Sequence, residues 1–250
     1  MKRALKIIPI LAIGTMALLY SCKDDSGFDC FMSTGDVKME SRAMAPFHFI
    51  ELHDNINLYL TQDTAVNSIE VEAGENLLPG ITTTIDKGHL VIHNENTCDW
   101  VRSFEVPINV YITFTDLDSI IFRAAGDLIF TNAWRNDSIQ FDVWEGAGNI
   151  DLKLDVFKSR VYVQYGVVNV TLSGISQVSY ISNKGYGPVN ALSLWTNYTF
   201  LGTYSPNDCF VYVAGEIGAT INNIGNVYYM GDPPVGNQVL TSSGKLIPIE

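Results

Sequence analysis

The chain has few charged residues, and basic residues are the scarcer kind. This scarcity argues against one class of binding partner. Only 17% of its 250 residues are charged, and 27 acidic against 15 basic side chains leave a formal net charge of -12. Lysine and arginine are the side chains that hold a phosphate backbone, so no nucleic-acid partner is expected. The hydrophobic content of 47% suffices for a sizeable core, which excludes a largely disordered chain.

The sequence also lacks the short motifs that mark catalysis. It contains no HExxH, no Walker A loop and no GxSxG elbow. A glycan-cleaving enzyme is the most tempting alternative, but cleaving uronate chains needs cations as well as an acid and a base. Residues 161–250 contain only two basic side chains, Lys184 and Lys245. We therefore predict a protein that is not an enzyme and uses no cofactor.

Histidine is scarce, and its placement gives little support for a metal site. The four histidines are His48, His53, His89 and His93. None has a cysteine beside it, and no His-x-His pair occurs. We therefore expect exposed histidines on strands and no bound metal.

The first 21 residues are typical of a secretory signal. The basic residues Lys2, Arg3 and Lys6 precede an uncharged run over residues 7–20, which is too short to span a bilayer comfortably. The run ends in a Ser-Cys pair that resembles a bacterial lipobox. We therefore predict that the signal is cut before Cys22 and that this cysteine is acylated.

The residues after Cys22 form a short charged segment. Lys23, Asp24 and Asp25 resemble the export tag of lipoproteins displayed by some Gram-negative gut bacteria, and the alternative is a polar tether without that role. We predict a lipidated tether over residues 22–45, anchored to the outer membrane and facing the exterior. An acidic chain is repelled by anionic lipid, so the acyl chains must hold it to the membrane.

Three cysteines remain after Cys22, so one intrachain disulfide at most can form. Cys30 with Cys98 is the preferred pair. Cys209 lies in an apolar run, where we expect a buried free thiol.

From residue 46 onward the chain repeats the two-residue alternation of half-buried strands. The clearest case has Val106, Ile108, Val110, Ile112 and Phe114 on one face. Residues 46–115 are therefore predicted to form a strand-rich N-terminal part of an all-β domain.

Residues 116–250 add a repeat that predicts the architecture. Short turns rich in glycine, asparagine and aspartate end near residues 127, 149, 169, 188, 208 and 226. A spacing near 20 residues, with strands between the turns, is typical of the stacked coils of a parallel β-solenoid. Whether the N-terminal strands begin this solenoid or cap it remains open.

These turns also carry a family resemblance. In order, the segments near residues 75–78, 119–127, 145–150 and 225–234 resemble the GIN-domain family, described as an auto-transporter adhesin head. The resemblance covers roughly residues 46–247. It implies a right-handed β-helix on the cell surface, and it carries over no catalytic residues.

Polar residues recur at the ends of these turns and allow two interpretations. They are Asp127, Asn149, Asn169, Asp208 and Asn226. A file of calcium ligands is one interpretation, but calcium needs 6–8 oxygens at one point and each coil supplies about one side chain. We favour turn residues whose amides hydrogen-bond along the solenoid axis.

Aromatic residues gather in one later coil and suggest a function. Trp195, Tyr198 and Tyr204 are the candidate ligand-binding residues, because exposed rings stack on sugars. Ladders that pack between coils are the alternative and the arrangement we favour. We predict a non-catalytic surface module that binds an extended glycan or a protein. An envelope spacer without a ligand is the second hypothesis, and the direction of these three side chains discriminates between them.

Overall fold

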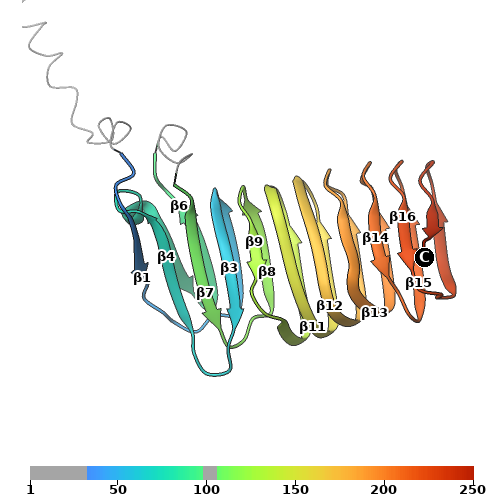
Figure 1. Cartoon of the computed structure of the whole chain (residues 1–250), viewed down its shortest axis with the longest axis horizontal. Coiled ribbons are helices and arrows are strands. Elements are labelled where there is room, and N and C mark those ends of the chain that lie inside the picture. Colours follow the sequence, from blue (N-terminus) through green and yellow to red (C-terminus); the bar gives the residue numbers. More distant parts are fainter. Residues whose placement is uncertain (1–32, 98–105) are drawn as a thin grey trace, which may run out of the picture.

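The structure is a computed structural model that describes residues 33–97 and 106–250, and these residues form an elongated stack of strands (Figure 1). Parallel strands build a β-solenoid of about six turns. Consecutive coils are offset by about 20 residues, as in the pairing of Ala147 with Val167. The all-β solenoid predicted from the turn spacing is therefore confirmed.

The elements are short at the two ends of the stack and long in its middle. The strands are β1 (Val37–Ser41), β2 (Phe49–Asp54), β3 (Ile56–Gln62), β4 (Ser68–Gly74), β5 (Ile81–Asp86), β6 (His89–Asn94), β7 (Ile108–Phe114), β8 (Ser119–Ala124), β9 (Leu128–Phe130), β10 (Trp134–Val143), β11 (Ala147–Val163), β12 (Val167–Asn183), β13 (Val189–Thr203), β14 (Cys209–Tyr212), β15 (Glu216–Ile221), β16 (Val227–Met230), β17 (Val235–Leu240) and β18 (Leu246–Pro248). The 3-10 turn η3 (Leu78–Gly80) is the only helical element among the described residues. Within the same ranges, no helix has the length and apolar character needed to cross a membrane.

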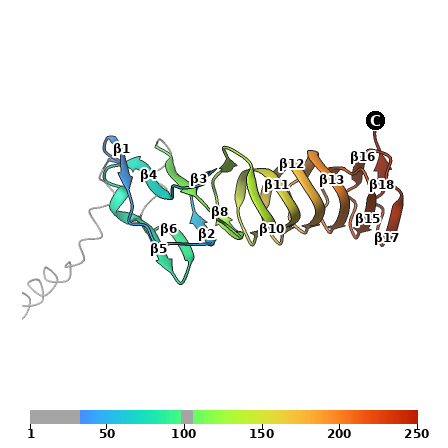
Figure 2. The ribbon, with the colours of Figure 1, turned by 90° about the horizontal axis from the view of Figure 1, so that it is seen from below.

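Two stacks of parallel strands form the walls of the solenoid, which Figure 2 shows from below. Face A consists, in spatial order, of β6, β2, β8, residues 138–143 of β10, 158–163 of β11, 178–183 of β12, 198–203 of β13, β15 and β17. Face B consists of β7, β3, β9, residues 147–156 of β11, 167–176 of β12, 189–196 of β13, β14, β16 and β18. The long strands β11, β12 and β13 therefore run through both faces.

The N-terminal strands both extend the solenoid and cap it. β2 pairs with β8 on one side and β6 on the other, while β3 lies between β7 and β9, all in parallel. The coil made of β2 and β3 is thus inserted between two coils that come later in the sequence. Antiparallel strands then close this end, because β5 pairs with β6, β4 with β7, and β1 with β4.

The antiparallel cap is fastened by polar contacts as well as by backbone pairing. Glu72 on β4 accepts hydrogen bonds from Asn109 Nδ2 at 2.9 Å and Tyr111 Oη at 2.8 Å, both on β7. These two hydrogen bonds lower the pKa of Glu72. Burial and the same carboxylate raise the pKa of Tyr111 to about 12. The cap therefore protects strand edges that would otherwise be open to pairing with another chain.

A polar ladder runs along face B and decides between the two interpretations of the turn residues. Hydrogen bonds link its members in the order Asn109, Asn57, Asp127, Asn149 and Asn169. The backbone N–H of Asp127 donates to Asn57 Oδ1, and the other links include a side-chain amide donor. The register places Pro188 next to Asn169, and proline offers no side-chain amide. The ladder therefore stops there, and a shorter one resumes from Asp208 to Asn226. Among the described residues, no group of three His, Cys, Asp or Glu could hold a metal ion.

The inside of the solenoid changes from rings to hydroxyl groups along its length. Large buried rings fill the N-terminal part, namely Phe114, Phe122, Phe130, Trp134 and Phe141. Further along, buried hydroxyls replace some of this apolar volume, and they bond to one another: Ser159 Oγ lies 2.9 Å from Ser176 Oγ, and Thr196 Oγ1 lies 2.7 Å from Thr199 Oγ1. Buried hydroxyls that are paired in this way carry little desolvation cost.

Candidate functional site

The candidate site lies on the outer surface of strand β13, where aromatic side chains follow one another. We call Trp195, Tyr198, Phe200 and Tyr204 the aromatic ridge. All four are between 38% and 49% exposed. The side chains of Trp195, Tyr198 and Tyr204 therefore point out of the coil, which is the arrangement that the binding hypothesis requires.

A corner in β13 explains why the ridge residues on both faces point outward, with Trp195 on face B and Tyr198 and Phe200 on face A. Trp195 and Tyr198 are three residues apart, so strict two-residue alternation would put them on opposite faces of the strand. The register with β12 skips Asn197, where the chain turns from face B to face A. Thr196 and Thr199 are both buried on either side of this corner. The alternation thus restarts at Asn197, and both rings face outward.

Buried hydrogen bonds hold the ridge in place from inside. Thr196 Oγ1 bonds to Thr199 Oγ1 and also donates to the backbone carbonyl of Tyr212 at 2.7 Å. At the other end of β13, the backbone N–H of Ser205 donates to Thr203 Oγ1 at 3.2 Å. The residues between the exposed rings are therefore fixed, which reduces the entropy lost when a ligand binds.

One ring of the ridge also belongs to a ladder between coils. Phe200 stacks on Tyr180 of β12, with ring centroids 5.2 Å apart and planes at 23°. Lys184 Nζ lies 6.0 Å from the centroid of the Tyr204 ring. Stacking between neighbouring coils therefore occurs on the outer surface, between Tyr180 and Phe200.

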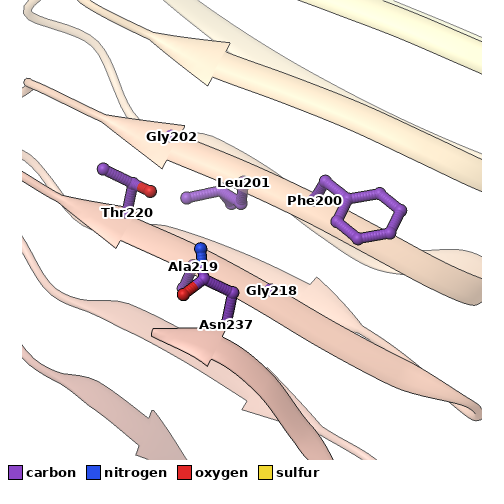
Figure 3. Close-up of a pocket in the computed structure, with 7 residues that line it drawn as sticks. All are labelled: Phe200, Leu201, Gly202, Gly218, Ala219, Thr220 and Asn237. Atoms are coloured by element: carbon purple, nitrogen blue, oxygen red, sulfur yellow. The ribbon is translucent and has the colours of Figure 1, made fainter. Parts of the chain in front are cut away.

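Next to Phe200 the surface is hollowed. The hollow measures about 220 Å³ and lies between β13 and β15, with one residue from β17 (Figure 3). Its lining is Phe200, Leu201, Gly202, Gly218, Ala219, Thr220 and Asn237. In Figure 3 the Phe200 ring and the Thr220 hydroxyl lie at opposite ends of this lining. No side chain of the lining is charged.

Sequence reasoning found three of the ridge residues but missed the hollow. The signal that could have found it is Gly202, a glycine inside a strand, which weakens pairing and often marks a place where another group approaches closely. Asn237 could not have been placed beside Gly218 from the sequence, because β17 reaches this position through a register shift opposite Gly218.

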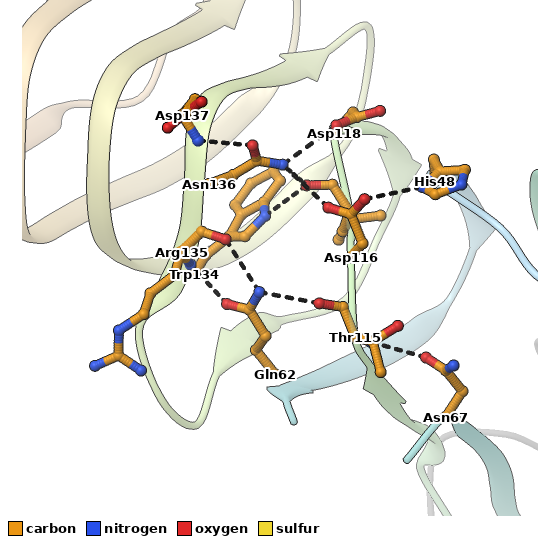
Figure 4. A network of polar contacts seen from close by, with 11 residues as sticks. His48, Gln62, Asn67, Thr115, Asp116, Asp118, Trp134, Arg135, Asn136 and Asp137 are labelled. Atoms are coloured by element: carbon orange, nitrogen blue, oxygen red, sulfur yellow. Dashed lines mark hydrogen bonds and ion pairs between the residues drawn. The ribbon is translucent and has the colours of Figure 1, made fainter. Parts of the chain in front are cut away.

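Near the other end of the solenoid, a network of side chains serves the backbone rather than a ligand (Figure 4). Residues 115–118 connect β7 to β8 past the inserted coil. Asn136 Nδ2 donates to the carbonyl of Leu117 at 3.0 Å and to Asp118 Oδ1 at 3.2 Å. Gln62 Nε2 donates to the carbonyl of Thr115 at 3.3 Å. These contacts supply hydrogen-bond partners for backbone carbonyls in a segment that leaves the regular stack of strands.

Three of the four histidines meet on face A beside Glu51. The rings of His53 and His93 stack with centroids 3.9 Å apart. Glu51 Oε1 lies 3.1 Å from His53 Nε2 and 3.0 Å from Arg123 Nε, while its Oε2 lies 3.5 Å from His89 Nε2. Burial, and then the neighbouring His93, lower the pKa of His53 despite Glu51. Glu51 therefore forms an ion pair with Arg123 at the capped end, and the histidines lie around this pair.

Cys209 is a buried free thiol, as predicted, and burial raises its pKa. The other predicted positions, Cys22, Lys23, Asp24, Asp25, Cys30 and Cys98, lie outside the described residues. Lipidation, the export tag and the disulfide therefore stay predictions.

Comparison with known proteins assigns the fold to a family. The family described as "Putative auto-transporter adhesin, head GIN domain" matches residues 46–233. The chain belongs to this GIN-domain family. Among curated proteins, no sequence matches the chain.

Solved structures share the GIN-domain fold with this chain. A putative adhesin from Bacteroides fragilis is 23% identical with a TM-score of 0.80, over 86% of this chain and 97% of that one. A putative adhesin from Parabacteroides distasonis is 15% identical with a TM-score of 0.69, over 86% and 98%. A putative lipid binding protein from the same species is 14% identical with a TM-score of 0.68, over 87% and 98%. At these identities the similarity shows the fold alone.

Proposed function

We propose that this protein is a non-catalytic, lipid-anchored module at the cell surface that binds an extended partner through the aromatic ridge. The observation that carries the proposal is the outward direction of Trp195, Tyr198 and Tyr204. Exposed rings on a surface with little charge are typical of the centres of binding interfaces. Membership in an adhesin family supports a position at the cell surface.

The charge distribution favours a neutral glycan or a protein surface over a polyanion. Residues 161–250 contain two basic side chains and four acidic ones. An anionic glycan would meet too few cations there to be held. The lining of the hollow offers neither a nucleophile with a neighbouring base nor a pair of carboxylates, which supports binding rather than catalysis.

An array of glycans and host-matrix proteins tests the binding proposal. The wild-type protein should be retained on a subset of the array, and Trp195→Ala should abolish that retention. Trp144→Ala is the matched control, because Trp144 is 47% exposed but lies at the turn after β10, beneath Arg123. A blank array for the wild type would favour the spacer hypothesis. Equal losses for the two variants would show that the ridge has no special role.

The anchoring part of the proposal has its own test. Cys22→Ser should remove labelling by a fatty-acid analogue, because no acyl chain can then be attached, and should either release the protein from membranes or leave its signal unprocessed. Replacing Lys23, Asp24 and Asp25 by alanine should keep the label but protect the protein from external protease. Unchanged labelling of Cys22→Ser would refute lipidation, and unchanged cleavage of the triple variant would refute the export tag.

A further inference from the structure

The hollow beside Phe200 depends on a glycine that packing does not explain. Gly202 lies inside β13, where its pairings with Ser182 and Thr220 are regular, so it marks no bulge. Its φ is not in the left-handed region that favours glycine. A Cβ atom added to Gly202 would meet no heavy atom within 4 Å. At every other glycine of residues 33–97 and 106–250, an added Cβ atom would have a neighbour within that distance. A side chain at this position would therefore cost nothing in packing.

Gly218, on the neighbouring strand, has an internal explanation. A Cβ atom there would lie 3.1 Å from Cδ1 of Phe200, and the register with β17 shifts at this residue. Gly218 therefore makes room for the Phe200 ring and for a bulge. Gly202 is therefore the residue whose missing side chain leaves space open to the outside. A strand glycine that neither a bulge, a positive φ nor a close neighbour explains is typical of a place where a ligand approaches the backbone closely.

From these observations we infer that the hollow at Gly202 is a subsite for one neutral sugar ring. The inference rests on the proposed function and names the class of ligand. The volume of about 220 Å³ is below the roughly 300–1,000 Å³ of pockets for drug-sized ligands, which suits one ring rather than an oligosaccharide. The rest of an extended glycan would continue along the ridge.

The lining supplies the two kinds of contact that a sugar needs. The Phe200 ring offers an apolar face to the C–H groups of a pyranose, and its stacking on Tyr180 fixes its orientation. The Thr220 hydroxyl and the Asn237 amide offer donors and acceptors for sugar hydroxyls. An anionic sugar is disfavoured, because the lining has no cation and Glu216 lies on the same strand two residues before Gly218.

The test is a titration of the purified protein with methyl glycosides of neutral hexoses and of glucuronic acid, followed by saturation-transfer NMR. At least one neutral methyl glycoside should bind the wild type more tightly than the glucuronide. Gly202→Leu should fill the hollow and weaken binding more than tenfold, with an unchanged or raised melting temperature. Phe200→Ala and Asn237→Ala should weaken it by roughly two- to tenfold each.

Two matched variants separate the subsite from general effects. Thr171→Leu adds the same side chain at an exposed position on face B, and Phe210→Ala removes a ring that stacks on Tyr228 of the same face. Both should bind like the wild type. Binding by Gly202→Leu at wild-type affinity, a preference for the glucuronide, or a protein dimer that Gly202→Leu disrupts would overturn the inference.

The array distinguishes the two levels of the argument. If the array retains the wild type but no neutral methyl glycoside binds, the subsite is refuted and the binding function of the ridge stands. If the array is blank and no glycoside binds, both are refuted.

Discussion

The two ends of the solenoid are built for different purposes. The N-terminal end has a core of large rings, an antiparallel cap and a surface of paired ions around Glu51. The C-terminal part has a core with paired hydroxyls, few charges, and a last strand on face A, β17, whose six residues are all exposed. The large buried rings therefore lie towards the closed end, and the exposed aromatic surface lies in the regular part of the stack.

The two tryptophans Trp134 and Trp195 give the sharpest contrast between these regions. Trp134 is fully buried, stacks on Phe130 at 5.0 Å, and donates from Nε1 to the carbonyl of Leu117 at 2.9 Å. Trp134→Ala should lower the free energy of unfolding by about 3–5 kcal/mol. Trp195→Ala should lower it by less than about 1 kcal/mol, because its ring is already exposed. Urea unfolding of both variants checks this, and equal losses would contradict the division.

Two glycines provide the next contrast. A Cβ atom at Gly187 would collide with the backbone carbonyl of Val168 in the preceding coil, whereas one at Gly202 meets nothing. Gly187→Ala should therefore lower the free energy of unfolding by roughly 1–3 kcal/mol, since the coils must move apart. Gly202→Ala should raise the free energy of unfolding by about 0.5–1 kcal/mol, because alanine loses less backbone conformational entropy than glycine on folding. Thermal unfolding measures both, and a destabilised Gly202→Ala would mean that this glycine has a structural role.

The hydroxyl pairs of the C-terminal core should contribute less than its apolar contacts. Thr199→Val keeps the volume but removes the bond to Thr196, which retains the Tyr212 carbonyl as acceptor. The free energy of unfolding should fall by about 0.5–1.5 kcal/mol. Thr171→Val, at an exposed position, should change it very little. If urea unfolding shows a larger loss of unfolding free energy for Thr199→Val, the buried hydroxyl pairs contribute more to the stability of the C-terminal part than expected.

The smallest expected effect is a pH dependence confined to the capped end. The pKa of His53 is lowered in the folded protein, so protonation favours the unfolded chain, and stability is complete above the unfolded value of about 6.5. The melting temperature should therefore fall slightly as pH drops from 7.5 to 5.5. His93→Gln should flatten this slope, since it removes the stacked neighbour, while Glu51, Asp54, His89 and Arg123 stay in place. A slope that steepens in this variant would contradict the assignment.

The repeat was predictable because it is local. Turns about 20 residues apart fix the coil length, and three successive turns each place one polar side chain at the start of a face B strand, which gives the ladder from Asp127 to Asn169. Burial of Cys209 followed from its apolar neighbours in the same way. These features depend on residues that lie close together in sequence or one coil apart.

The remaining features depend on distant pairing or on a broken pattern. Nothing local indicates that β3 lies between β7 and β9, because its pairing partners are some 50 to 70 residues away. The skip at Asn197 reverses the parity of β13, so the direction of Tyr198 could not be read from that of Trp195. The hollow required both a strand glycine and the later strands β15 and β17.

The central claim is that the aromatic ridge binds and does not stabilise. One measurement tests it directly: array binding by the variant Trp195→Ala/Tyr198→Ala/Tyr204→Ala at a concentration of folded protein equal to that of the wild type. The account predicts that the wild type is retained on part of the array and that the triple variant, folded and monodisperse, is not. Retention of the triple variant at the wild-type level would contradict the claim.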